Sequence, residues 1–260
     1  MKKSLYLALV TSIGLGLTGC ISTHALNTKI QKIEQKHNVI VKAGNPLSRC
    51  CLFGDISGLL DMIDKDLEKC PPYFKDHIGP VVIEESFADN LEIFPLSGFL
   101  RGYVYINEKQ QRFPVHIKNR SLIEKVLFFA PKDEDVFLHE ASHSFEFNVQ
   151  AQSNAEWERF YYAFNAAQTK AYDGIFPRLL FLSVPVAGYL RPAGMASLYG
   201  ASNHLEDSAE THCYLRKHNN NVEFLKKKDP VLYKKCRIAE KFVNGEYGTE
   251  RQNKLAKSKS

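Results

Sequence analysis

The sequence predicts an α+β fold, with a mixed sheet in its first half and a mostly helical second half. Two observations indicate this order. Short apolar segments of strand length alternate with amphipathic helices as far as residue 117, and helical periodicity dominates after residue 133. The chain of 260 residues is long enough, once its leader is removed, for one domain with a sizeable core.

Residues 1–19 have the pattern of a signal peptide, with Lys2-Lys3 before an apolar stretch over residues 5–17. The stretch is too short to span a bilayer comfortably as a mature helix. It runs into Leu17-Thr18-Gly19-Cys20, which resembles the bacterial lipobox. That resemblance implies cleavage before Cys20, a lipid on Cys20 and anchoring in the cell envelope outside the cytoplasm. An ordinary secretory peptide with an incidental cysteine is the alternative.

The residue after the lipidation site bears on sorting between membranes. The residue after Cys20 is Ile21 and not an aspartate. By the usual sorting pattern for such lipoproteins, Ile21 implies the outer membrane if the organism has one.

The charge of the mature chain is close to balanced. The formal charge of +5 falls to +3 when Lys2 and Lys3 leave with the leader. Such a weak excess predicts neither a nucleic-acid partner nor a strongly acidic one.

Five further cysteines follow Cys20, and an exported chain lies in a compartment that permits disulfides. They are Cys50, Cys51, Cys70, Cys213 and Cys236. An odd number leaves at least one thiol free or paired elsewhere, and none of the spacings is that of a zinc finger. We expect Cys213 to pair with Cys236, and Cys70 with Cys50 or Cys51, although the sequence does not fix the connectivity.

Two amphipathic helices are predicted before the first proline pair. The first covers residues 26–37, with Ile30 and Ile33 on one side. The second covers residues 52–70 and stops at Pro71-Pro72.

Four strands are predicted from β-branched and aromatic runs that end at turn residues: 38–42, 81–83, 103–107 and 113–117. The polar segment 108–111 joins the last two strands into a predicted hairpin. Pro114 lacks a backbone N–H, so we expect the last strand to lie at an edge of the sheet.

The strongest functional signal is His139-Glu140-Ala141-Ser142-His143, an H-E-x-x-H motif in a predicted helix that starts near Asp133. Positions four apart lie on one helix face, so His139 and His143 can bind the same metal ion. Neutral imidazole nitrogens are good Zn²⁺ ligands. Glu140 lies beside the first ligand, where it can take a proton from zinc-activated water as a general base.

A chance match is the alternative, because a helix can carry two histidines and a glutamate without any function. The neighbours argue against chance, since they are apolar: Val136, Phe137, Leu138, Ala141, Phe145 and Phe147. Two histidines buried in such surroundings without a ligand or partner would be costly.

Two segments after the motif carry less information. The aromatic residues between Trp157 and Tyr172 predict a helix packed on the core rather than a ligand platform. The apolar stretch 176–200 is interrupted by prolines, by Arg178 and by Arg191, which excludes a membrane span. It is either a lid or cleft wall, or irregular core structure.

A catalytic zinc usually takes three protein ligands and leaves one position open. Glu146 and Val149 stand where metzincins need glycine and histidine, which excludes that family. The best source of a third ligand is residues 203–211, which open a predicted helix. Glu206 and Glu210 are four apart, so one can bind the metal while the other accepts the outer N–H of a ligand histidine.

The run Glu206-Asp207-Ser208-Ala209-Glu210 resembles the second motif of gluzincin peptidases, particularly the catalytic domain of anthrax lethal factor and its bacterial relatives. The resemblance covers residues 133–215 and implies that Glu206 is the third zinc ligand. It also implies that Tyr199, seven positions before Glu206, stabilises the oxyanion of the transition state. Ser208 departs from the pattern, because many relatives carry an aromatic residue there.

The resemblance further implies a zincin-like fold, with a twisted sheet above the H-E-x-x-H helix and an edge strand that binds substrate backbone. Strand 103–106 or strand 113–117 is nearest the motif. The domain would cover residues 26–243, after a lipid anchor and tether at 20–25. The implied activity is that of a Zn²⁺-dependent metallopeptidase that acts on a peptide or protein and is attached to the membrane through Cys20.

Simpler interpretations stay open for the residues taken from this resemblance. Glu206 could complete a capping box with Asn203, and Tyr199 could be a loop aromatic packed on the core. His204 and Glu210 are then the other candidate ligands.

Two other functions also stay open. One is an envelope binding or assembly lipoprotein with a structural metal site; Glu140 argues against it, because such a site needs ligands and no base. The other is a metal-dependent amidase that acts on cell wall by the same zinc-water chemistry.

The last 17 residues, 244–260, are polar, contain Lys254, Lys257 and Lys259, and lack apolar periodicity. They predict a disordered basic tail.

Overall fold

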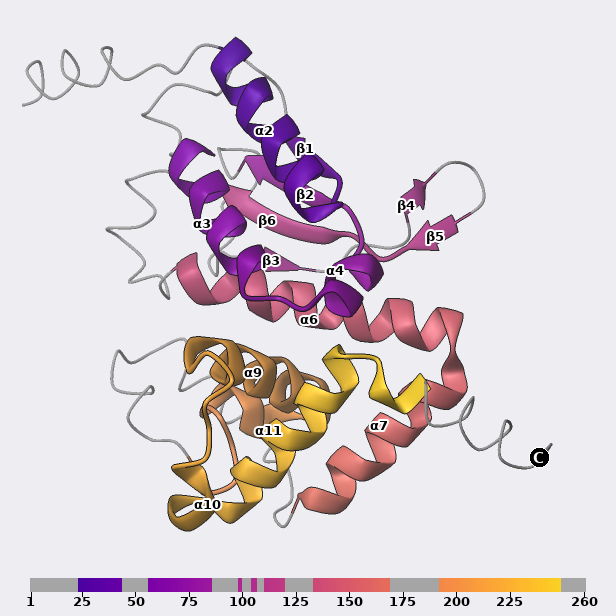
Figure 1. Ribbon diagram of the computed structural model, residues 1–260, viewed down its shortest axis with the longest axis vertical. Helices are drawn as coiled ribbons and strands as arrows, with labels where there is room; N and C mark the ends of the chain where they lie inside the picture. The colour runs from indigo at the N-terminus through magenta and orange to yellow at the C-terminus, as the bar shows by residue number, and fades with distance from the viewer. Residues whose placement is uncertain are drawn as a thin grey trace, which may run out of the picture.

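One long helix, α6 (Asp133–Gln152), runs between a part of the molecule that contains the sheet and a part that is helical (Figure 1). The structure is a computed structural model. It describes residues 23–43, 56–85, 98–99, 104–106, 110–119, 133–168 and 192–248. The mixed α/β character predicted from the sequence is confirmed, and helices predominate.

The principal sheet is mixed and has four strands in the order β1-β2-β6-β3. The first two pairings are parallel, and β3 pairs with β6 in the antiparallel sense. The bounds are β1 Val41–Ala43, β2 Val81–Glu85, β6 Val115–Asn119 and β3 Gly98–Phe99. A separate hairpin joins β4 (Val104–Ile106) to β5 (Gln110–Arg112).

The predicted hairpin between residues 103–107 and 113–117 is wrong. The supposed turn contains part of β5, which pairs with β4, while β6 lies inside the principal sheet. Burial explains the interior place of β6: Val115 and Ile117 are at most 2 % exposed, and His116 on the opposite face is 7 % exposed. Pro114 precedes the strand, so its missing N–H removes no bond from the ladder.

The first helices begin and end close to the predicted places. Helix α2 covers Thr23–His37, so it takes in residues assigned to the tether, and α3 covers Ile56–Glu68. Asn38 has a φ of 56°, which keeps it out of the predicted strand 38–42, and β1 starts only at Val41. Pro72 begins the short helix α4 (Pro72–His77), where a first-turn proline loses no hydrogen bond.

Two polar side chains of α6 hold the sheet part against it. Ser144 donates a hydrogen bond to the carbonyl of Phe113 at 2.6 Å and accepts one from the N–H of Gly79 at 2.9 Å. Asn148 accepts from the N–H of Phe113 at 2.8 Å. Gly79 lies so close that a Cβ built there would be 1.9 Å from the carbonyl oxygen of Phe113. These contacts fix where β6 begins relative to the motif helix.

The helical part packs on the side of α6 opposite the sheet part, and aromatic rings contribute to this packing (Figure 1). Its elements are α7 (Asn154–Ala167), η5 (Tyr199–Ser202), α9 (His204–Lys217), α10 (Leu225–Lys228) and α11 (Pro230–Val243). The rings of Phe160 and Phe242 stack at 3.9 Å, and Phe145 of α6 meets Phe242 at 4.9 Å. The helix predicted over residues 157–172 is displaced, because α7 starts at Asn154 and ends at Ala167.

The packed part of the chain extends beyond residue 243, where the tail was predicted to begin. Tyr247 packs against the main core, and its carbonyl accepts a hydrogen bond from Arg159. Gly245, with a φ of 72°, turns the chain so that this contact can form. Residues 249–260 lie outside the described residues.

The expected disulfide between Cys213 and Cys236 is wrong. Both are buried free thiols, Cys213 in the main core and Cys236 in a separate cluster with Leu215, Leu225 and Leu232. Cys70 is also a free thiol; burial raises its pKa to about 12, so it behaves as a small apolar side chain. Its expected partners, Cys50 and Cys51, lie outside the described residues.

Several predicted features fall where the structure gives no description. These are the leader 1–19, the lipidation site Cys20 and most of the apolar stretch 176–200. Within the described part of the chain, no helix has the length and apolar character that crossing a membrane requires.

Gly79→Ala should lower the free energy of unfolding by about 2–3 kcal/mol, because the new methyl group displaces the backbone of Phe113. Chemical denaturation of the full-length protein in detergent measures this. Gly58→Ala, within α3, is the matched control and should be neutral or stabilising by up to about 1 kcal/mol. Equal stability of the two variants would contradict the close approach at Gly79.

Candidate metal centre

Helix α6 presents both motif histidines on one face, one turn apart. The Nε2 atoms of His139 and His143 lie 3.1 Å from each other, with the ring planes nearly perpendicular at 86°. Both side chains are largely buried, with exposed fractions of 12 % and 9 %. Two ring nitrogens that converge at this distance present their lone pairs to a common point, which is what a metal ion requires.

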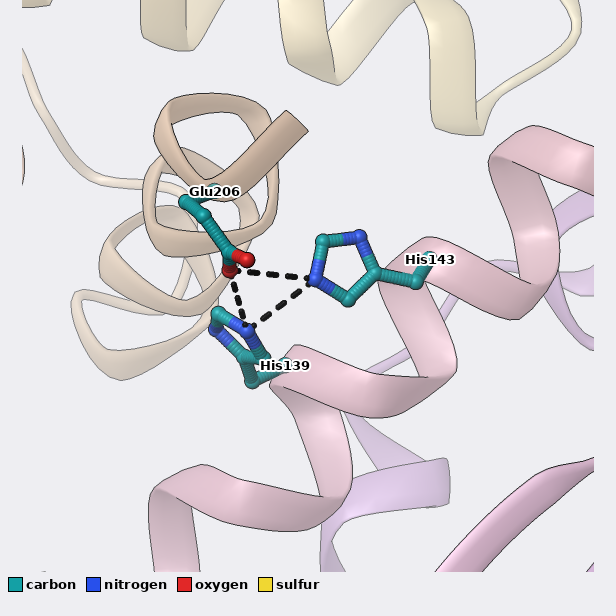
Figure 2. A group of neighbouring side chains, drawn as sticks. All are labelled: His139, His143 and Glu206. Atoms are coloured by element: carbon teal, nitrogen blue, oxygen red, sulfur yellow. Dashed lines mark hydrogen bonds and ion pairs between the residues drawn. The ribbon is translucent and has the colours of Figure 1, made fainter. Parts of the chain in front are cut away.

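Helix α9 brings the third group. Asn203 caps this helix by accepting hydrogen bonds from the N–H groups of Leu205 and Glu206. The cap fixes the first turn, from which the Glu206 side chain extends to α6 (Figure 2). Its Oε2 atom lies 3.0 Å from Nε2 of His139 and 3.3 Å from Nε2 of His143. Glu206 is therefore both the N3 residue of a capped helix and part of the histidine cluster.

The three atoms lie slightly closer together than the ligand atoms of a tetrahedral zinc site. Bonds of about 2.0–2.1 Å at tetrahedral angles place neighbouring ligand atoms about 3.3–3.4 Å apart. The observed separations are 3.0, 3.1 and 3.3 Å. Two imidazoles and one carboxylate are also a usual donor set of catalytic zinc. In the described part of the chain, this is the group of histidine, cysteine and acidic side chains that could hold a metal ion.

The carboxylate and the imidazoles shift one another's protonation. Burial alone would raise the pKa of Glu206, but hydrogen bonds with His139 and His143 outweigh it and hold that pKa well below its usual range. Burial alone would lower the pKa of His139, but bonds to Glu206 and Glu210 raise it well above the usual value. A metal ion at this point therefore replaces a proton, so its binding competes with protonation.

Glu210 orients the first histidine. Its Oε1 atom lies 2.8 Å from Nδ1 of His139, on the side of the ring away from Glu206. A carboxylate at Nδ1 fixes the tautomer that leaves Nε2 free for a metal and makes that nitrogen more basic. Glu206 and Glu210, one turn apart on α9, thus have different positions: Glu206 lies at the Nε2 atom of His139, and Glu210 lies at its Nδ1 atom.

Glu140 follows the first histidine on α6. Its side chain is partly buried, and burial raises its pKa, although positive charge on His139, His143 or His116 would lower it. A carboxylate whose pKa is raised toward neutrality is suited to accept and return a proton. His116 was not singled out in the sequence; its place on β6, the strand that packs on α6, brings it near Glu140.

Tyr199 lies beside the centre, whereas His204 does not join it. The ring of Tyr199, in η5, is 5.6 Å from the ring of His139 and tilted by 45°. His204 instead meets the ring of Tyr161 edge-on at 4.7 Å. The structure therefore groups Glu206, rather than the other candidate His204, with the histidines.

A second polar contact between α6 and α9 was missed in the sequence. Glu146 is 1 % exposed and accepts a hydrogen bond from Ser208. Burial raises the pKa of Glu146 to about 8, so it is neutral where other carboxyl groups are ionised. The only local signal was an acid between Phe145 and Phe147 on an apolar helix. Ser208, which departs from the gluzincin pattern, donates the hydrogen bond that this buried acid accepts.

No family model, no curated protein and no solved structure matches this chain. The interpretation of the centre accordingly depends on its geometry and chemistry.

Glu206→Ala should weaken zinc binding by more than the roughly 10–100-fold that loss of an outer partner costs, because a ligand itself is removed. Competition with a chromophoric chelator measures the dissociation constant, and about one zinc per chain is expected in the wild type. The exposed Glu158→Ala is the control and should bind zinc as the wild type does. Full retention of zinc by Glu206→Ala would transfer the ligand role to His204 or Glu210.

Glu146→Gln should reduce the loss of stability as the pH rises from 5 to 8. The folded state holds a proton on Glu146 up to about pH 8, whereas the unfolded chain releases it near the ordinary value of 4.5. Folding is therefore progressively disfavoured across this window in the wild type only, by about 2–4 kcal/mol relative to the variant. Urea denaturation in EDTA measures the difference, and Glu158→Gln should follow the wild type.

Proposed function

We propose that this chain is a zinc-dependent metallopeptidase of zincin-like fold and gluzincin type. One observation carries the proposal: Nε2 of His139, Nε2 of His143 and Oε2 of Glu206 converge within 3.3 Å of one another beside a glutamate of the H-E-x-x-H type. The open side of a three-ligand site leaves room for water and substrate. The presence of Glu140 favours turnover over a purely structural metal site.

The chemistry divides among few groups. When bound, zinc supplies a Lewis acid that polarises the scissile carbonyl and lowers the pKa of water. Glu140 would accept a proton from the attacking water and then deliver it to the nitrogen of the scissile bond. The peptide C–N bond would then break with a neutral amine as the leaving group. Glu210 keeps His139 in the orientation and tautomer that the metal needs.

Tyr199 has the right chemistry for the oxyanion. The 5.6 Å between its ring and that of His139 supports a role for this phenol at the former carbonyl oxygen, where negative charge would develop. A hydrogen bond donated there is stronger in the transition state than in the ground state, which is the condition for a rate effect.

Strand β3 is the part of the sheet best suited to hold substrate backbone. Of the two strands considered from the sequence, strand 113–117 cannot do so, because β6 is paired on both sides, and strand 103–106 contains β4 of the separate hairpin. Strand β3 is one of the two outer strands of the described sheet, it packs on α6, and one of its sides is unpaired within that sheet. An extended peptide could add to it by main-chain hydrogen bonds.

The proposed location is the outside of the bacterial cytoplasmic membrane or the outer membrane, by way of a lipid on Cys20. The sequence supports this through the lipobox-like run Leu17-Thr18-Gly19-Cys20. Helix α2 starts at Thr23, so a lipid on Cys20 would hold the domain close to the membrane surface.

Glu140→Gln tests the proposal most directly, since glutamine keeps the size of the side chain and cannot take a proton. We expect zinc affinity within about twofold of wild type and a fall in kcat of about 10²–10⁴. Mass spectrometry of a peptide mixture treated with the zinc-loaded protein measures cleavage, and Glu158→Gln is the control outside the site.

Three outcomes would contradict the proposal. Cleavage by Glu140→Gln at the wild-type rate would show that Glu140 is not the general base. Release of fragments from purified cell wall, without cleavage of peptides, would assign the centre to an amidase. Zinc held by four protein ligands, with no turnover of either substrate, would leave a structural site in a binding lipoprotein.

A further inference from the structure

The most deeply buried cation of the described chain pairs with the residue that follows Glu206. Lys235, on α11, has an exposed fraction of 0 %. Its Nζ atom is 2.5 Å from Oδ2 of Asp207, which is also completely buried. Nζ further donates to the carbonyl of Gly194 at 2.8 Å and approaches the sulfur of Met195 at 3.6 Å. An ammonium group has three N–H donors, and three acceptors surround it here.

We propose that Lys235 is a positioning residue of the metal centre, which sets the rotation of α9 that aims Glu206 and the course of the segment that carries Tyr199. This inference rests on the proposed function and assigns a buried pair to the same site. A buried ion pair costs desolvation on both sides and seldom stabilises more than apolar packing does. Its placement here, one residue from a metal ligand, is what calls for a role beyond stability.

The first consequence concerns α9. Asp207 directly follows Glu206, and successive residues of an α-helix point about 100° apart around its axis. Glu206 reaches α6, while Asp207 reaches Lys235 of α11. The helix is thus held from two directions near one point. Rotation of α9 about its axis would break the Asp207–Lys235 contact as it moved the Glu206 carboxylate away from the histidines.

The second consequence concerns the segment before Tyr199. The peptide groups of Gly194 are held from two sides, since its N–H donates to Asp229 at 3.0 Å and its carbonyl accepts from Lys235. Gly194 has a φ of 84°, and a Cβ there would be 2.7 Å from Val231 of α11. Both anchoring side chains belong to the start and body of α11. Tyr199 follows five residues later, so this anchor limits the course of the chain that leads to it.

A third contact joins this segment to α9. A Cβ at Gly200 would come within 3.2 Å of the Cα of Asp207, so η5 lies directly on α9 where the buried pair is attached. A hydrogen bond with Ser197 of the same segment helps to lower the pKa of Glu210. Lys235 therefore connects, through Asp207 and Gly194, both elements that approach His139 from the helical part.

The test replaces the pair by apolar residues, Asp207→Leu with Lys235→Met, so that no charge is left buried alone. The full-length protein in detergent is titrated with zinc in chelator competition, and its cobalt form is examined by visible absorption. We expect a folded protein whose zinc affinity is at least about tenfold weaker, with an altered cobalt spectrum. With a cleaved peptide in hand, kcat should fall about tenfold or more while KM changes less than about twofold.

The matched control removes an ion pair by the same substitutions elsewhere. Lys29 and Asp61 form a contact of 2.6 Å between α2 and α3, and Asp61 is 68 % exposed. Lys29→Met with Asp61→Leu should leave zinc affinity and cobalt spectrum unchanged. Equal effects of the two double variants would show that Lys235 contributes only to general stability.

Each outcome decides between the inference and the proposed function. A folded Asp207→Leu/Lys235→Met protein with wild-type zinc affinity and spectrum would overturn the inference and leave the peptidase proposal standing. Wild-type protein that binds zinc and cleaves no peptide would overturn the peptidase proposal, while affinity and spectrum still decide the role of Lys235. If the double variant does not fold, Asp207→Asn with Lys235→Gln decides instead, because this neutral pair keeps hydrogen-bonding groups and leaves no charge buried alone. Wild-type affinity and spectrum in Asp207→Asn/Lys235→Gln would overturn the inference, and a weakened affinity with an altered spectrum would support it.

Discussion

The packing of α9 across α6 is the constraint on which the centre depends, and polar contacts define it. Imidazole and carboxylate groups of His139, His143, Glu206 and Glu210 meet across this interface, and the Glu146–Ser208 bond crosses it as well. Apolar surfaces tolerate a slide of one helix along the other, whereas buried polar groups lose a bond for every such shift. The register of these two helices is therefore set by hydrogen bonding, and the arrangement of His139, His143 and Glu206 follows from that register.

Helix α6 can carry such a site because it is held on several sides. Ser144 and Asn148 attach the sheet part through Phe113, and Phe145 meets Phe242 from the helical part. Between residues 136 and 150 no residue of this helix is exposed, so polar and apolar residues do not separate into two faces there. The positions of its motif histidines consequently depend on contacts of α6 with both the sheet part and the helical part of the molecule.

Local signals in the sequence predicted much of this arrangement, while contacts between distant segments escaped it. The spacing of His139 and His143, the cap at Asn203 and the end of α3 before Pro71-Pro72 depend on neighbours within one helical turn. The place of β6 between β2 and β3 depends on segments far apart in the chain, and the nearest turn suggested a wrong partner. Burial of Glu146 and Lys235 has no local signal, since both acids and lysines usually mark a solvated surface.

The charges of the centre explain why these residues belong together. With neutral histidines, the carboxylates of Glu140, Glu206 and Glu210 leave a strong local excess of negative charge in a partly buried place. Protons on the imidazoles or a divalent cation between them can balance it, and the cation satisfies three converging atoms at once. Glu146 adds no further charge at neutral pH, because burial raises its pKa to about 8 and Ser208 holds it. A centre balanced in this way would hold a divalent cation best once its histidines are deprotonated, so the occupancy of the proposed metal site would depend on the protonation of His139 and His143.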